Sequence, residues 1–139
     1  MQIKTLSFEV QTKGYNDIID ITPQVASLLS ESGLVEGSVL VFAPGSTAGI
    51  TTIEYEPGLL KDYPQFMEKI IPSKQVYQHD ETWHDGNGFS HVRAALQGAS
   101  FTVPFAAGGM LLGTWQQIIL VDFDNRSRRR NIIVQLTGQ

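Results

Sequence analysis

The sequence has no cysteine among its 139 residues. Disulfides, thiolate metal sites and cysteine nucleophiles are therefore excluded, so any metal ion must bind through nitrogen and oxygen ligands. Positive charge is also scarce, because 10 basic side chains stand against 14 acidic ones and the formal net charge is −4. A chain of this charge offers no general cationic field for a polyanion, so we expect no nucleic-acid partner.

Long apolar runs and obvious domain boundaries are missing as well. No apolar stretch approaches the ~18 residues that a membrane-spanning helix needs. The first residues, MQIKTLSFEV, lack the apolar core and cleavage pattern of a signal peptide. We therefore expect a cytoplasmic protein with no membrane partner. The length suits one domain, residues 1–139, without linkers, low-complexity tracts or internal repeats.

Three segments have patterns typical of helices. Residues 22–33 combine an expected cap at Thr22, a proline in the first turn, an apolar stripe and a terminal Gly33. Residues 57–71 repeat apolar residues at helical spacing, although Pro64 must kink or divide that helix. The segment NGFSHVRAALQG predicts a third, short helix that ends before its last glycine.

Strand patterns surround these helices and dominate the C-terminal half. They cover residues 6–10, 38–43, 49–54, 100–105, 110–124 and 130–136. A further short strand is expected at Val76–Tyr77. This irregular order favours an α+β fold, with a mostly antiparallel sheet and two to three helices, over a doubly wound fold.

All three histidines fall in the thirteen-residue segment HDETWHDGNGFSH, which begins at His79. Their spacing matches no short metal signature, so the residues alone leave a metal site, an acid/base site and a polar loop open. We expect His79 and His91 to be active and His84 to be peripheral, because the first follows the expected strand and the second begins the expected helix. Asp85 or Asn87 could cap that helix or orient an imidazole.

Arginines gather where the last strand begins, at positions 126, 128, 129 and 130. Alternate residues of a strand point to opposite faces, so Arg128 and Arg130 share one face. Their planar guanidinium groups suit a phosphate. The alternative is that they keep the turn soluble or pair with Asp122 and Asp124. Arg93 is a separate candidate for phosphate binding.

Several separated motifs resemble the YjbQ-type family, often labelled secondary thiamine-phosphate synthases. They are STAGITTIEYE, YQH at 77–79, SHVRAALQG at 90–98, LGTWQ at 112–116 and RRR at 128–130. The resemblance covers nearly the whole chain and implies a compact α+β domain that assembles as a homotrimer, with a pocket near subunit boundaries. The long apolar strand expected at 110–124 agrees with burial between subunits.

The resemblance also implies a function on phosphorylated small molecules. It suggests a transferase with weak thiamine-phosphate synthase activity, which joins a pyrimidine pyrophosphate to a thiazole phosphate, and a divalent metal such as zinc or magnesium. By motif, His79, His91 and Glu54 are the catalytic candidates, and the two histidines are the metal ligands. The pocket is expected to include Thr47, Asp85, Asn87 and Thr114.

One position departs from the family pattern. Where the family's H-T-T-A element usually begins with histidine, this chain has Gly45, followed by Ser46. The change removes a nitrogen donor and a titratable group. Two hypotheses therefore stay open: an enzyme, and a non-catalytic trimer that binds a metal or a phosphorylated metabolite.

Overall fold

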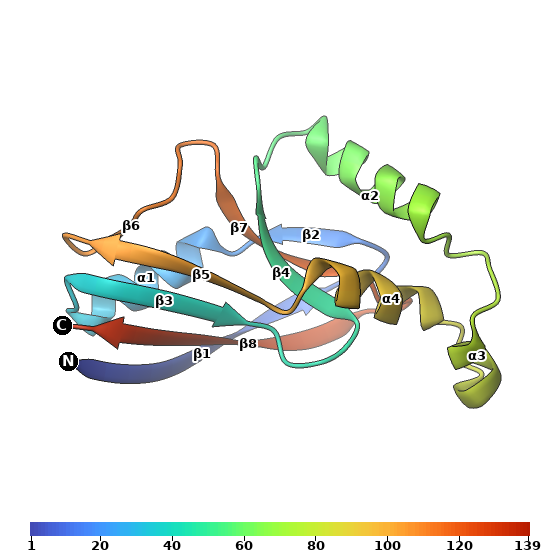
Figure 1. The fold of residues 1–139 in the computed structure, drawn as a ribbon, viewed down its shortest axis with the longest axis horizontal. Helices are drawn as coiled ribbons and strands as arrows, with labels where there is room; N and C mark the ends of the chain where they lie inside the picture. The colour runs from blue at the N-terminus through green and yellow to red at the C-terminus, as the bar shows by residue number, and fades with distance from the viewer.

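Two antiparallel sheets form the framework of the computed structural model, which describes residues 1–139 (Figure 1). The larger has the order β1 (Gln2–Thr12), β8 (Arg128–Gly138), β3 (Glu36–Phe42), β5 (Ser100–Ala106) and β6 (Gly109–Met110). The smaller has the order β2 (Asp17–Asp20), β7 (Gln117–Asp122) and β4 (Ala48–Ile53). Every neighbouring pair is antiparallel. The expected α+β class with a mostly antiparallel sheet is confirmed.

Four helices accompany the sheets, one more than the sequence predicts. They are α1 (Thr22–Ser32), α2 (Leu59–Ile70), α3 (Gln78–Trp83) and α4 (Gly88–Gln97). Pro64 lies inside α2 without dividing it. Gly33 ends α1 in the left-handed conformation, as expected, at φ 75°. None of the four is long and apolar enough to cross a membrane.

Thr22 does not cap α1, contrary to the prediction. The N-cap residue is Ile21, and no side chain caps this end of the helix. The Thr22 hydroxyl instead accepts a hydrogen bond of 2.8 Å from the backbone N–H of Ile118 in β7. The Thr22 side chain therefore bonds to a neighbouring strand and not to the end of its own helix, where the local sequence predicts it.

The prediction of a strand at Val76–Tyr77 is also wrong, because Tyr77 is the N-cap residue of the additional helix α3. The Asp80 carboxylate accepts a hydrogen bond of 3.1 Å from the Tyr77 N–H, which satisfies a donor at the helix start. His79 consequently belongs to the first turn of a helix rather than to the end of a strand.

The long strand expected at 110–124 is interrupted, since 111–116 form no strand. Two glutamines stabilise the interruption. The Gln116 side chain accepts a hydrogen bond from the Gly113 N–H at 3.0 Å, and the Gln117 amide donates to the Thr114 carbonyl at 3.3 Å. The argument for subunit contact from a long apolar strand therefore no longer applies.

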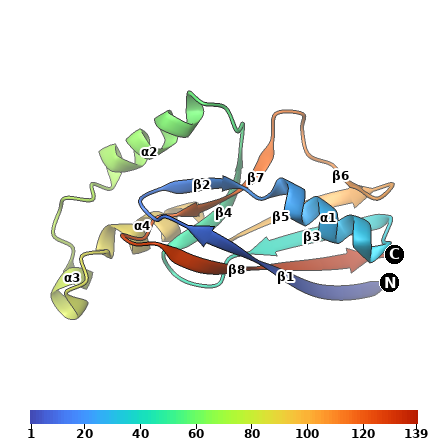
Figure 2. The same ribbon diagram turned by 180° about the vertical axis from the view of Figure 1, so that it is seen from behind.

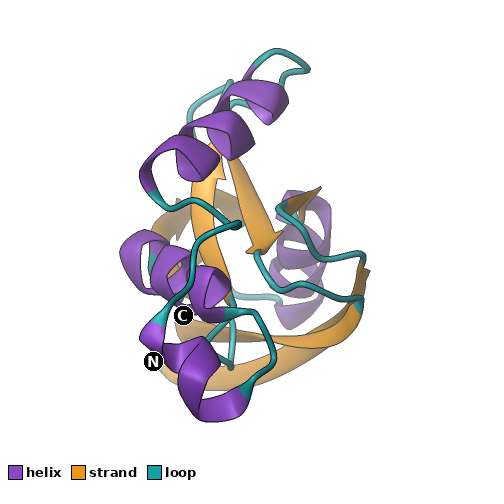
Figure 3. Cartoon of the chain, turned by 90° about the vertical axis from the view of Figure 1, so that its right-hand side faces the viewer, coloured by secondary structure: helices purple, strands orange, loops and turns teal.

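Strand β7 is buried on both faces, which explains its continuous apolar run. Ile118 and Leu120 point into the core between the two sheets and α1. Ile119 and Val121 point the other way, into a second core that includes Met67 of α2 together with residues of α4. Figures 2 and 3 show the helices distributed around the curled strands, with α1 on the side away from α2 and α4.

The register of the strands brings three chain segments to one edge. In β8 the buried residues alternate, so Arg128 and Arg130 continue the inward-facing row of the buried Ile132 beyond the apolar core. The beginning of β4 pairs with the end of β7, with Ala48 opposite Asp122. The N-cap residue of α4, Asn87, donates a hydrogen bond to Asp124 just after β7, which places the first turn of this helix beside the same edge.

Candidate functional site

A polar cavity of about 370 Å³ opens at this edge, between the starts of β4 and β8 and the helices α3 and α4. Its lining residues are Gly45, Ser46, Thr47, His79, Trp83, Asp85, Asn87, His91, Arg128 and Arg130. The cavity thus brings together the two histidines expected to be active, two of the three arginines and three of the four further pocket residues.

The two imidazoles lie against each other inside the polar cavity. Their ring centroids are 4.2 Å apart and the planes are tilted by 37°. Burial, with a smaller effect of the neighbouring His79, lowers the pKa of His91 below its ordinary value, which favours the neutral imidazole. The Nδ1 atom of His79 is buried and has no hydrogen-bond partner.

Carboxylates approach His79 from two directions. Its Nδ1 lies 3.6 Å from Oδ1 of Asp85 and 3.9 Å from Oδ1 of Asp80. One ligand atom from each of these three residues falls within 4.8 Å of the others. Zinc ligands at about 2.0–2.1 Å in tetrahedral geometry stand about 3.3 Å apart, so the donors need only a small movement to share an ion.

Asp80 is the part of the site that sequence reasoning missed. Its two oxygens accept backbone hydrogen bonds from Gly88 at 2.9 Å and from Tyr77 at 3.1 Å, and these bonds hold the Asp80 pKa below its usual value. The side chain thereby fastens the start of α4, which carries His91, to the start of α3. The available signal was its position three residues after Tyr77, where a capping side chain stands.

The arginines on the opposite wall are anchored by buried carboxylates. Arg130 donates from Nε and Nη2 to the two oxygens of Asp122 at 2.8 and 2.9 Å, and from Nη2 to Thr47 at 2.7 Å. Arg128 donates from Nε to Asp124 at 3.0 Å. Both aspartates are fully buried. The alternative that these arginines pair with Asp122 and Asp124 is confirmed, yet neither Nη1 group has a hydrogen-bond partner in the protein.

Asp124 connects this wall to the loop before α4. Burial alone would raise its pKa, but hydrogen bonds from Asn125, Asn87, Thr47 and Arg128 outweigh that effect and hold the pKa below its usual value. The Asn87 amide nitrogen donates to Asp124 at 3.2 Å. The Oδ1 atom of Asn87 has no hydrogen-bond partner, although Asn87 is only 6% exposed.

Gly45, the departure from the family motif, lies on the rim of the cavity. Its φ of +119° falls in a region that side chains rarely adopt. A Cβ atom added there would stand 3.2 Å from Nη1 of Arg130. The glycine therefore leaves that guanidinium group accessible, and an imidazole at this position would crowd it.

Glu54 and Thr114 are not brought to the histidines. They line a separate cavity of about 390 Å³ together with the exposed Trp115. The reason is the length of β4, because Thr47 precedes its first residue and Glu54 follows its last. Seven residues of extended chain span about 23 Å.

Arg93 also lies elsewhere, with 1% of its surface exposed. Its guanidinium group donates to the Ile71 carbonyl, to Glu68 at 2.7 Å and to Asn16 at 2.9 Å. Residues two apart on a helix face different directions, so Arg93 points away from His91 toward the end of α2. Its contacts tie α4 to α2 and to the loop between β1 and β2.

His84 ends α3 in a left-handed conformation at φ 57° and is exposed. It lines none of the cavities. This position agrees with a peripheral role, and its effect on metal binding stays a prediction.

Comparison with known proteins identifies the family. The family model described as UPF0047 protein YjbQ-like matches residues 6–139. The chain belongs to this YjbQ-like family. A UPF0047 protein of Archaeoglobus fulgidus is 41% identical over 86% of this chain and 91% of its own length. The UPF0047 protein YugU of Bacillus subtilis is 33% identical over 98% and 99%, respectively.

Two solved structures share the fold. A hypothetical protein from Aeropyrum pernix K1 superposes with a TM-score of 0.90 at 31% identity, covering 98% of this chain and 99% of that one. A YbjQ-like protein of unknown function from Sulfolobus solfataricus P2 gives a TM-score of 0.89 at 29% identity, with 99% and 100% coverage. The YjbQ-like α+β fold is thereby established across the whole chain.

Proposed function

We propose that the polar cavity binds a divalent metal ion and a phosphorylated small molecule side by side, as the active site of a transferase. One observation carries this proposal: His79, whose buried Nδ1 has no partner, lines the same cavity as Arg128 and Arg130, whose Nη1 groups have no hydrogen-bond partner in the protein. Nitrogen and carboxylate donors suit a cation such as zinc. Guanidinium donors suit a phosphate.

The arginine wall supplies directed hydrogen-bond donors rather than net positive charge. Arg128 and Arg130 are neutralised by two fully buried aspartates, so the four groups together carry no net charge. Their Nη1 groups can still donate charge-assisted hydrogen bonds to phosphate oxygens. A divalent ion held by the converging donors of His79, Asp80 and Asp85, with the His91 ring beside them, would add the missing positive charge. Phosphate affinity should therefore depend on the metal.

His91 is the residue best suited to accept a proton when it is not engaged by a metal. Its lowered pKa keeps the imidazole neutral near pH 7. The transfer implied by the family resemblance joins a pyrimidine pyrophosphate to a thiazole phosphate and releases pyrophosphate. The bound ion would neutralise charge on the departing phosphate groups.

The second candidate is a non-catalytic homotrimer that binds the same metal and phosphorylated metabolite without turnover. Gly45 favours it, because the glycine provides no titratable group and a side chain there would meet Arg130 at 3.2 Å. Both candidates require the same binding site and differ only in turnover. The homotrimer itself rests on the family resemblance, and light scattering at micromolar concentration tests it.

Two measurements on the purified protein test the proposed function. Calorimetric titration with inorganic phosphate, with and without zinc or magnesium, should show binding that strengthens when the metal is present. Incubation with the pyrimidine pyrophosphate and the thiazole phosphate should then yield thiamine phosphate. Metal-dependent phosphate binding without product supports the non-catalytic alternative, and absence of both metal and phosphate binding contradicts the two candidates together.

A further inference from the structure

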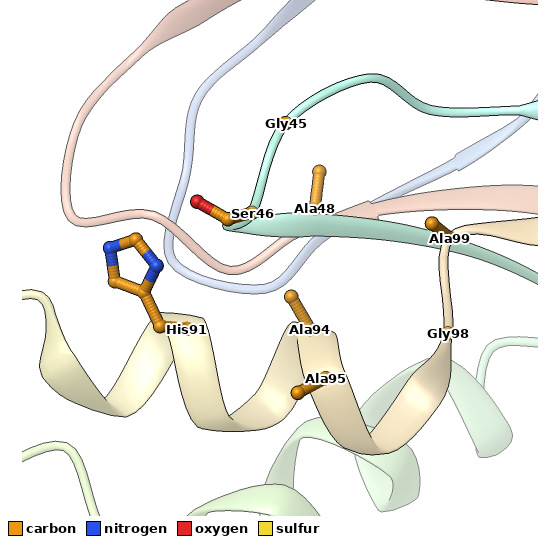
Figure 4. Close-up of a pocket in the computed structure, with 8 residues that line it drawn as sticks. All are labelled: Gly45, Ser46, Ala48, His91, Ala94, Ala95, Gly98 and Ala99. Carbon is orange, nitrogen blue, oxygen red and sulfur yellow. The ribbon is translucent and has the colours of Figure 1, made fainter.

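A second cavity, of about 430 Å³, adjoins the polar cavity and shares Gly45, Ser46 and His91 with it. We call this second cavity the alanine groove, and its other lining residues are Ala48, Ala94, Ala95, Gly98 and Ala99. Figure 4 shows the groove between helix α4 and the segment that leads into β4, with His91 extending toward Ser46 at one end.

The alanine groove is lined mainly by glycine and alanine. Apart from Ser46 and His91, no lining residue extends beyond Cβ. One wall is the surface of α4 that carries Ala94 and Ala95, and the other is the segment around Ala48, toward which Ala94 points. The groove therefore combines an apolar body with a polar end at the histidine, where it meets the polar cavity.

An unsatisfied polar group in the adjoining polar cavity, on Asn87, points independently to a ligand. Asn87 is only 6% exposed, and its amide nitrogen is committed to Asp124, yet its Oδ1 has no partner. Burying an acceptor without a hydrogen bond costs about 1–3 kcal/mol, so such atoms concentrate where something else supplies the partner. The polar cavity thus contains groups that a ligand would satisfy, and the alanine groove provides space beside it.

We infer that the alanine groove binds the uncharged, apolar part of a phosphate monoester whose phosphate is held by Arg128 and Arg130. This inference rests on the proposed function, because the phosphate anchors the molecule and the groove selects what is attached to it. A volume of about 430 Å³ lies at the lower end of the range for small-molecule sites, about 300–1,000 Å³, and suits a body the size of a single ring. Ala95 lines the groove from the helix side and is exposed.

Binding of two simple esters tests the inference on the wild-type chain. Methyl phosphate and phenyl phosphate carry the same dianionic group at pH 8 and differ in the apolar body. With saturating magnesium, phenyl phosphate should bind about tenfold more tightly, because one face of its ring leaves water. Equal affinities for the two esters would overturn the groove assignment and leave phosphate binding intact.

A filling variant tests the same point from the protein side. Ala95 is exposed on α4, and leucine is almost as favourable as alanine in a helix, so Ala95→Leu should fold. It should remove the tenfold advantage of phenyl phosphate and leave methyl phosphate affinity unchanged. Ala26→Leu, the same change at an exposed position of α1 outside every cavity, is the matched control and should behave as wild type.

The outcomes separate this inference from the proposed function. If neither ester nor inorganic phosphate binds with or without metal, both are wrong. If methyl phosphate binds and Ala95→Leu keeps the full preference for phenyl phosphate, the anchor is supported and the alanine groove is rejected as the apolar subsite.

Discussion

The two walls of the polar cavity differ in how completely their polar groups are satisfied. On the arginine wall, the fully buried Asp122 and Asp124 are each paired with a guanidinium group. On the histidine wall, His79 Nδ1 has no partner and its nearest carboxylate oxygens remain 3.6 and 3.9 Å away. On the arginine wall the buried carboxylates are paired without a ligand and only the two Nη1 groups remain free to bind an anion, whereas the histidine wall has a donor set that a cation would complete. Stability and binding should therefore respond differently to changes on the two walls.

Removing a carboxylate from the arginine wall should have the largest effect on stability. Asp122→Ala leaves Arg130, which is 11% exposed, without its bidentate partner. Breaking a buried pair in this way costs about 3–5 kcal/mol. His91→Ala, on the other wall, should cost about 1 kcal/mol. Urea unfolding of both variants measures the difference, and equal losses would contradict the contrast between the walls.

Exchanging arginine for lysine separates the anion-binding role of this wall from its charge. Arg130→Lys keeps the positive charge but loses the planar fork, so inorganic phosphate should bind about tenfold more weakly. Arg128→Lys should act in the same direction. Arg129→Lys is the matched control, because Arg129 is 71% exposed in its side chain and faces away from the cavity. Unchanged calorimetric affinity in both cavity variants would assign them a structural role only.

Gly45 tests how closely the rim approaches the arginine wall. Gly45→Ala should lower stability by about 1 kcal/mol, because an L side chain is strained at φ +119°. It should also weaken phosphate binding, since the new Cβ stands 3.2 Å from Arg130 Nη1. Gly33→Ala is the control, because it introduces backbone strain at a positive φ but no atom lies within 4 Å of the added Cβ. Phosphate affinity equal in both variants would show that position 45 does not restrict the anion site.

The smallest effect concerns the pH dependence of the histidine wall. The folded protein lowers the pKa of His91, so it binds fewer protons than the unfolded chain once the pH falls below about 6.5. The free energy of unfolding should therefore decrease as the pH drops through that value toward the folded pKa. His91→Gln should flatten this part of the profile. An NMR titration of His91 at or above the ordinary value would contradict the assignment.

The sequence was sufficient to predict those parts of the site whose structure depends on local residue patterns. The helix over SHVRAALQG is present, and strand alternation correctly placed Arg128 and Arg130 on one face. The pairing of these arginines with Asp122 and Asp124 was foreseen only as an alternative, because the sequence does not show how the turn between β7 and β8 closes.

The remaining site predictions depended on distances that motifs do not encode. Glu54 and Thr47 belong to one motif, but a six-residue strand separates them. Arg93 is close to His91 in sequence and turned away from it by the helix. His79 was placed after a strand because apolar residues precede it, whereas the Asp80 contacts start a helix instead. In each case the direction of a backbone element decided which neighbours meet.

Zinc titration by calorimetry on wild type, His79→Ala, His84→Ala and His91→Ala tests the central claim most directly. Wild type and His84→Ala should bind one zinc ion per chain with equal affinity, because His84 is exposed outside the cavity. His79→Ala and His91→Ala should each lose at least about tenfold in affinity, since even residues behind a metal ligand contribute that much. Loss of zinc binding in His84→Ala, with wild-type affinity in either of the other two variants, would contradict a metal site built on His79 and His91.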